Sequence, residues 1–335
     1  MQDPHGGNIH AHPVKLDFSA NINPLGIPER MLSAIHASAE QWAHYPDPAC
    51  LMLAEALAAQ EGYPADHIVC GNGADDLLYR IAGAFRPKTA LLAEPCFGEY
   101  RRALEAAGCE VLSYKLKKEA DFALSDAIFG KIAQQPDLLL LCTPNNPTGR
   151  LIDPELLAEI AERCEKSGIL FVLDACFIAL TEAHARRLPR TALIVNAFTK
   201  SHAIPGIRIG YALCPDARTA QKLRSQGQYW SVSAPAQAAG LAALREQDYL
   251  AAARSLIAEE RAFLSGALTR LGCNVCPSDA NFMLFQSTPG LAERLLQKGI
   301  LIRSCANFDG LDETWYRIAV RSHEENLALL QAMQG

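Results

Sequence analysis

The sequence predicts an α/β protein, in which a three-layer αβα large domain with a mainly parallel sheet precedes a smaller α+β domain. Three observations predict this fold. The 335 residues exceed what one small core usually holds. Short apolar runs alternate with amphipathic helical patterns from about residue 66 to 215, and this alternation ends near residue 235. We therefore expect an N-terminal segment (1–40), a large domain (41–235) and a small domain (236–335).

Apolar strands separated by helices predict a parallel sheet in the large domain, because this pattern is typical of a sheet that is covered by helices on both faces. The last two expected strands have little helix between them, which predicts an antiparallel strand at that point. The expected strands are 67–70, 89–93, 137–142, 169–173, 192–195 and 207–213, and the expected helices are 74–85, 98–107 and 154–166.

The small domain is expected to begin with a long helix, which we interpret as the hinge between the domains. Residues 1–40 show no sheet of their own and are expected to pack on the small domain. The expected helices are 247–271, 291–298 and one at the C-terminal end, with strands at 281–285, 300–303 and 315–320.

Composition excludes several classes of partner. The formal net charge is −6 and the pI is about 5.9, so no basic excess favours nucleic acid or an anionic membrane. The first residues show neither a basic nor an apolar signal region, and apolar runs such as Leu138–Cys142 are too short to span a bilayer. A cytoplasmic protein without a membrane or nucleic-acid partner is expected.

The eleven cysteines are odd in number, and most stand singly in apolar segments, as at Cys70, Cys142 and Cys214. This pattern favours buried thiols in a reducing compartment over a disulfide framework. Cys273 and Cys276 form a Cys-x-x-Cys pair without a second pair or a histidine cluster. A structural zinc or a redox dithiol stays open there, two strand cysteines are favoured, and no metal site is expected.

Polar residues follow the expected strands, where ligands bind in α/β folds. Gly71-Asn-Gly-Ala-Asp75 opens a helix whose N–H groups could hold an anion, although a plain loop is the alternative. A second polar segment, Thr143-Pro-Asn-Asn-Pro-Thr-Gly149, follows the expected strand 137–142. Its adjacent asparagine amides could contact a ligand, and a rigid turn is the alternative.

Charged residues mark two further strand ends. Asp174 ends an apolar strand, and a buried carboxylate needs a partner, which could also be a structural salt bridge. Lys200 and Arg208 flank the last strand, and a buried lysine with a lowered pKa can form a Schiff base. Two solvated charges do not fit, because the neighbouring Ile207 and Ile209 have the pattern of core residues.

The order of these motifs along the chain resembles that of the class I/II aminotransferase superfamily of fold-type I enzymes. The motifs are, in order, Asn-Pro-Thr-Gly, Asp174, Thr199-Lys200 and Arg208-Ile-Gly210. The resemblance covers essentially the whole chain. It implies pyridoxal 5'-phosphate (PLP) as cofactor, bound as a Schiff base to Lys200. It also implies that Asp174 pairs with the pyridinium nitrogen and that Asn146 donates to the phenolate oxygen.

The resemblance implies further cofactor contacts. Phe97 would stack on the pyridine ring, and Tyr45 in Tyr45-Pro-Asp-Pro48 would reach the phosphate bound by a neighbouring subunit. A homodimer with shared active sites follows from this role of Tyr45. The implied phosphate-binding residues are Gly73, Ala74, Asp75, Thr199 and Arg208.

Within the superfamily, the chain most resembles the L-threonine-O-3-phosphate decarboxylases of cobalamin biosynthesis. The features are His5-Gly-Gly-Asn8, Leu16–Gly26 with Asn-Ile-Asn-Pro, Ala203–Arg208 and Ile302–Leu311. The implied reaction converts L-threonine O-3-phosphate to (R)-1-amino-2-propanol O-2-phosphate and CO₂. The implied substrate residues are Arg317 for the carboxylate, His5 and Arg303 for the phosphate, and Asn23.

The chain departs from the family pattern in three places. Residues 9–16 form a shortened segment, Asp174-Ala-Cys-Phe177 lacks a tyrosine hydroxyl, and Ala197 stands where a serine is usual. Decarboxylation and transamination differ in which bond at Cα breaks, and the sequence does not show this. A histidinol-phosphate or aromatic amino-acid aminotransferase is therefore the alternative function. A non-catalytic PLP-binding homologue is a second alternative, which the presence of Lys200 disfavours.

Overall fold

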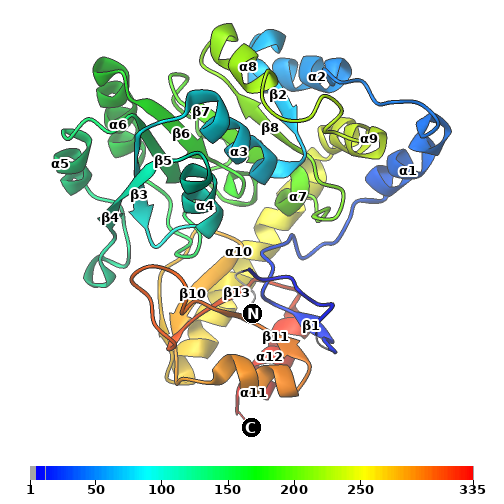
Figure 1. Cartoon of the computed structure of the whole chain (residues 1–335). Helices are drawn as coiled ribbons and strands as arrows, with labels where there is room; N and C mark the ends of the chain where they lie inside the picture. The colour runs from blue at the N-terminus through cyan, green and yellow to red at the C-terminus, as the bar shows by residue number, and fades with distance from the viewer. Residues whose placement is uncertain (1–4, 12, 335) are drawn as a thin grey trace.

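The computed structural model describes residues 5–11 and 13–334 of the chain. A larger unit built on a seven-stranded sheet lies above a smaller one, and helix α10 (Gln247–Arg270) runs from one to the other (Figure 1). This helix coincides with the expected long helix.

The large sheet has the strand order β2-β8-β7-β6-β5-β3-β4. Strand β8 runs opposite to the other strands, so its pairings with β2 and β7 are antiparallel and the remaining pairings are parallel, which confirms the predicted mainly parallel sheet with one antiparallel insertion. The strands are β2 (Ile68–Gly71), β3 (Thr89–Glu94), β4 (Glu110–Lys115), β5 (Leu138–Cys142), β6 (Leu170–Asp174), β7 (Leu193–Ala197) and β8 (Gly210–Leu213). The sequence did not predict β4, because this edge strand is half-exposed and polar residues interrupt its apolar pattern.

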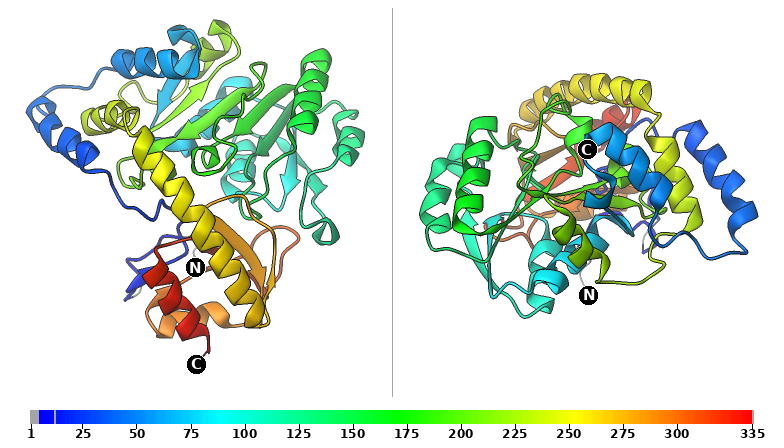
Figure 2. Two further views of the ribbon diagram at one scale, coloured as in Figure 1. Left: turned by 180° about the vertical axis from the view of Figure 1, so that it is seen from behind. Right: turned by 90° about the horizontal axis from the view of Figure 1, so that it is seen from above.

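Helices cover both faces of the sheet, so the predicted three layers are present (Figure 2). Neighbouring strand residues point to opposite faces, and Leu91 and Leu92 accordingly belong to different hydrophobic clusters. One layer contains α3 (Gly73–Phe85), α4 (Gly98–Ala106) and α8 (Ala217–Arg224), and the other contains α2 (Leu51–Glu61), α5 (Phe129–Ile132), α6 (Pro154–Ser167) and α9 (Ala234–Ala243).

The smaller unit contains a four-stranded antiparallel sheet in the order β12-β13-β10-β9. Its strands are β9 (Asn274–Val275), β10 (Phe282–Gln286), β12 (Arg303–Ser304) and β13 (Trp315–Ala319), and its helices are α11 (Leu291–Gln297) and α12 (His323–Gln334). Near the N-terminus, β1 (Leu16–Asp17) pairs in parallel with β11 (Ile300–Leu301), and α1 (Glu29–Ala37) packs on α9 of the larger unit. The domain boundaries at residues 40 and 235 stay a prediction.

None of the helices within residues 5–11 and 13–334 is both long and apolar enough to cross a membrane. All eleven cysteines are free thiols, and ten of them are buried, Cys96 being partly exposed. Cys273 and Cys276 belong to this buried set, which agrees with the favoured interpretation of that pair.

The loop after β5 is tied to the loop before β10, which joins the two units beside the cavity described below. Asp279 donates its N–H to the Gly149 carbonyl at 2.9 Å and accepts the Leu151 N–H at 3.0 Å. Gly149 has φ +75°, and a Cβ there would lie 2.1 Å from Ser278 Oγ. Glycine is therefore required both by the backbone conformation and by this close approach.

We expect Gly149→Ala to lower the free energy of unfolding by about 2–4 kcal/mol, because backbone strain and a steric clash add together. Gly168→Ala is the matched control, since Gly168 has φ +68° but no heavy atom within 4 Å of its Cβ position. The control should cost only about 1 kcal/mol. Equal losses in urea unfolding would show that the contact with Ser278 is unimportant.

Candidate active site

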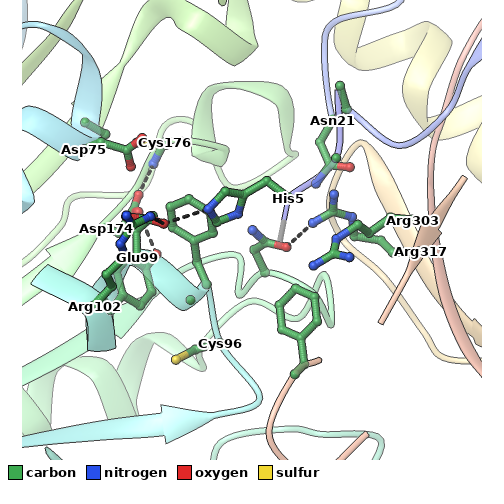
Figure 3. Close-up of a pocket in the computed structure, with 18 of the residues that line it drawn as sticks. His5, Asn21, Asp75, Cys96, Glu99, Arg102, Asp174, Cys176, Arg303 and Arg317 are labelled. Atoms are coloured by element: carbon green, nitrogen blue, oxygen red, sulfur yellow. Dashed lines mark hydrogen bonds and ion pairs between the residues drawn. The ribbon is translucent and has the colours of Figure 1, made fainter. Parts of the chain in front are cut away.

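The site lies where the parallel strands end. The register aligns Cys142 of β5 with Asp174 of β6, and Asp174 with Val195 of β7. The segments that follow these strands therefore meet at one edge of the sheet. They border a cavity of about 730 Å³ that residues of the smaller unit and of the N-terminal segment also line (Figure 3).

Most of the predicted site residues line this cavity. These are His5, Ala74, Asp75, Phe97, Asn146, Asp174, Thr199, Lys200, Arg208, Arg303 and Arg317. Three others do not line it, namely Gly73, Tyr45 and Asn23. Gly73 lies directly behind the cavity wall, where a Cβ would approach Arg208 Nη2 to 2.4 Å. Tyr45 is 76% exposed and stacks on Trp230 with ring centroids 4.1 Å apart.

Asn23 supports the active-site turn from behind. Its backbone N–H donates to the Lys200 carbonyl at 3.0 Å, and its side chain donates to the Ser201 carbonyl at 2.8 Å. Asn21, two residues earlier in the same motif, lines the cavity instead. Its buried Oδ1 has no hydrogen-bond partner within the described part of the chain. Such an orphaned acceptor is suited to a ligand donor, and the sequence motif contained this residue without distinguishing it.

Lys200 lies in α7 (Phe198–Ser201), the short helical turn directly after β7. Burial, together with the positive charges of Arg317 and Arg208, lowers the pKa of Lys200 from its usual value to about 8. An amine with this pKa is partly neutral near pH 7–8, and the neutral form is the nucleophile. The site therefore prepares Lys200 for covalent chemistry.

Asp174 is held by two donors that leave its carboxylate at the cavity. Tyr100 donates its hydroxyl to Oδ2 at 2.6 Å, and the Cys176 N–H donates to Oδ1 at 2.9 Å. Sequence reasoning missed Tyr100, because it lies on α4 and only the fold brings it to β6. Burial, together with the negative charge of Asp174, raises the pKa of Tyr100, which keeps this hydroxyl a donor.

An anion-binding corner lies at the N-terminus of α3. Gly73 begins the helix with φ +83°, and the Arg208 guanidinium fills the space where a Cβ would be. Arg208 itself has φ +60° and donates Nη1 to the Pro205 carbonyl at 3.1 Å. Asp75 lies 3.9 Å from Arg208 Nη2. Helix N–H groups and a guanidinium together favour a phosphate.

Two arginines of the smaller unit face this corner from the other side of the cavity. Arg303 and Arg317 are directly paired across β12 and β13, and both are more than 90% buried. Arg317 donates to Asn146 Oδ1 and, at 2.7 Å, to the Ser19 carbonyl. Arg303 donates to Asn307 Oδ1 at 2.7 Å. Burial lowers the pKa of Arg317 to about 10, so it stays a cation at neutral pH.

The residues fit PLP group by group. Arg208 and the α3 N-terminus suit the phosphate, Lys200 the aldehyde, Asn146 the phenolate oxygen and Asp174 the ring nitrogen. The approach of 2.4 Å between a Gly73 Cβ and Arg208 shows a cradle that only glycine permits. The three-layer fold and this cavity define a PLP-dependent enzyme of fold type I.

Comparison with known proteins gives the family. The family model of aminotransferase class I and II matches residues 13–333, and the chain belongs to this family. A threonine-phosphate decarboxylase from Salmonella typhimurium is similar, with 38% identity over 99% of this chain and 96% of that protein. The adenosylcobalamin biosynthesis bifunctional protein of Leptospira interrogans is 31% identical over 99% of this chain and 41% of its own length.

The solved structure of a histidinol-phosphate aminotransferase from Clostridium acetobutylicum superposes with a TM-score of 0.89 and 29% identity, over 96% of this chain and 98% of that one. The predicted family, fold class and cofactor are thus confirmed. The individual roles of the site residues stay predictions.

We expect the apoenzyme to capture PLP covalently at a rate that rises with pH and reaches half its maximum near pH 8, since only neutral Lys200 attacks the aldehyde. Visible absorbance and borohydride trapping would measure the capture. Lys200→Ala should abolish it with the fold intact, whereas Lys166→Ala, at an exposed helix position, should not. Trapped cofactor in Lys200→Ala would contradict the assignment.

Proposed function

We propose that the protein decarboxylates L-threonine O-3-phosphate to (R)-1-amino-2-propanol O-2-phosphate and CO₂, as a step in cobalamin biosynthesis. The observation that carries this proposal is the pair of buried, cross-strand arginines that line the PLP cavity, Arg303 and Arg317. The similarity to a threonine-phosphate decarboxylase and to an adenosylcobalamin biosynthesis protein supports it.

The two arginines match a substrate with two anionic groups. A guanidinium binds carboxylate or phosphate through two parallel hydrogen bonds, and its burial strengthens both the attraction and the geometric demand. We assign Arg317 to the carboxylate and Arg303, with His5, to the phosphate. A substrate with a single anionic group would use only one of these two guanidinium groups.

PLP, when bound, supplies the electron sink for the pair left on Cα when a bond there breaks. Asp174 would hold a proton on the ring nitrogen of the bound cofactor, and Tyr100 and the Cys176 N–H hold Asp174 in place. Loss of CO₂ requires that a proton takes its place on Cα. Lys200 Nζ, whose pKa is about 8, is the group we assign to deliver it.

The orientation of the substrate decides between decarboxylation and transamination. Arg317 comes from β13 and is fixed by Asn146 and the Ser19 carbonyl, so a carboxylate bound to it has a defined direction. In the alternative function, an aminotransferase for histidinol phosphate or an aromatic amino acid, the Cα–H bond breaks instead. The similarity to a histidinol-phosphate aminotransferase structure keeps this the second candidate.

The proposal includes a cytoplasmic homodimer with shared active sites. Exposed aromatic and apolar side chains lie on the connection before α2, at the start of α2 and around Trp230, which supports a second copy as the partner of this surface. They are Trp42, Tyr45, Leu51, Met52, Tyr229 and Trp230. Tyr45 is then available to reach the phosphate in the neighbouring subunit. Eleven free thiols suit a reducing compartment.

We expect the holoenzyme to release CO₂ from L-threonine O-3-phosphate without a keto acid, because no amino-group acceptor is needed. The measurement is CO₂ release across a panel of threonine phosphate, serine phosphate, histidinol phosphate and aromatic amino acids, each with and without 2-oxoglutarate. Turnover that depends on the keto acid and releases no CO₂ would establish the aminotransferase instead.

We expect Arg303→Ala to lower kcat/KM for threonine phosphate by about 30-fold or more, since losing a charged hydrogen-bond partner costs about 2–5 kcal/mol. Its residual activity on unphosphorylated threonine should change little. Arg294→Ala is the matched control, because Arg294 is an exposed arginine of α11 outside the cavity. Equal losses on both substrates would mean that Arg303 supports the fold rather than binds the phosphate.

A further inference from the structure

We propose that Glu99 is a positioning residue that holds His5 in the cavity, and that it thereby favours phosphorylated over unphosphorylated substrates. This inference rests on the proposed function and concerns a residue that the family motifs did not single out. Glu99 lies in the first turn of α4 and lines the same cavity as His5, Arg303 and Arg317 (Figure 3).

The contact between the two residues is short and specific. His5 Nε2 lies 2.6 Å from Glu99 Oε1. Because a carboxylate only accepts hydrogen bonds, Nε2 must carry the proton in this contact. The His5 ring also lies against Phe97, with centroids 5.5 Å apart and a tilt of 49°. The carboxylate and the phenyl ring both restrict the position and the orientation of the imidazole.

Glu99 is fixed independently of His5. Tyr79 donates its hydroxyl to Oε2 at 3.2 Å, and Arg102 donates to Oε1 at 3.3 Å. Burial raises the pKa of Glu99, but hydrogen bonds and charge from His5, Tyr79 and Arg102 lower it overall, so the side chain is a carboxylate at neutral pH. The acceptor for His5 is therefore already formed in the wall of the cavity.

The segment that bears His5 comes from the opposite side of the cavity. Gly7 donates its N–H to Ser19 Oγ at 2.7 Å, and Ser19 donates to Asp17 Oδ1 at 2.6 Å, next to β1 on the smaller unit. Gly6 packs so closely that a Cβ would lie 2.3 Å from the Ser19 carbonyl oxygen. The His5–Glu99 pair thus connects this segment to α4 of the larger unit beside the cavity.

Substrate selection follows from this arrangement. A histidine held by a carboxylate is ordered before the substrate arrives, so binding does not have to restrict its side-chain rotation. A phosphate that contacts His5 benefits from this order, whereas a substrate without a phosphate does not. Bond breaking at Cα occurs near Lys200 and Asp174, so the effect of Glu99 belongs in KM and not in kcat.

Glu99→Gln tests the inference, because it keeps the shape and removes the charge. In the holoenzyme, KM for threonine phosphate should rise about tenfold, equivalent to about 1.4 kcal/mol, with kcat changed by less than about twofold. Kinetics with unphosphorylated threonine should stay the same. Glu105→Gln is the matched control, since Glu105 lies on the same helix, is exposed and does not line the cavity.

A double-mutant cycle with His5→Ala separates positioning from general support of the fold. Once His5 is absent, Glu99→Gln should change KM by less than about twofold more. Additive effects, or an equal loss on both substrates, would overturn the inference. His5→Ala alone also tests it if the Glu99 variant fails to fold, because an unchanged KM there would remove the role that Glu99 is proposed to serve.

Hydrogen–deuterium exchange gives a readout that needs no catalysis. In the apoenzyme, Glu99→Gln should speed exchange in peptides that contain residues 6–9, and Glu105→Gln should not. Unchanged exchange would overturn the structural part of the inference. If the wild-type protein does not act on threonine phosphate but exchange responds as expected, the proposed function fails while the Glu99–His5 contact stands.

Discussion

The parallel pairing of β5, β6 and β7 determines where Asp174 and the turn that bears Lys200 lie. The register that aligns Cys142, Asp174 and Val195 brings the segments that follow these three strands to the same edge of the sheet. A slip of one residue would turn the Asp174 side chain to the opposite face of the sheet. The carboxylate would then lose its contact with Tyr100, and its place beside the turn that bears Lys200 would be lost as well.

Positive groups of the cavity come from both units and lie on two sides of it. Burial lowers the pKa of Lys200 to about 8 and leaves Arg317 charged, while Asp75, although its pKa is raised by burial, faces Arg208. The arginines on β12 and β13 add positive charge from the smaller unit. A cofactor phosphate near Arg208 and an anionic substrate near the two strand arginines would therefore each meet a guanidinium.

The sequence was sufficient for residues whose chemistry follows directly from a strand end. Asp174 and Lys200 stand out because a charged side chain follows an apolar run. It was insufficient for Asn21 and Asn23, since both belong to one motif and only the local backbone decides which faces the cavity. Tyr100 and Glu99 were also missed, because their partners lie on other segments and helical spacing alone says nothing of them. The edge strand β4 was not predicted either, because its side chains are half-exposed and do not form a continuous apolar run.

The hydrogen bonds of Arg317 have a further consequence for selectivity. Asn146 and the Ser19 carbonyl each accept one hydrogen bond from an Nη atom, and the buried Nε has no hydrogen-bond partner within the described residues. A guanidinium has five N–H donors, so an arriving carboxylate can bind the remaining donors while these two bonds keep the group in place. A monodentate anion uses fewer of the fixed donors than a bidentate carboxylate does. The bonds that hold Arg317 therefore also disfavour small simple anions at this site.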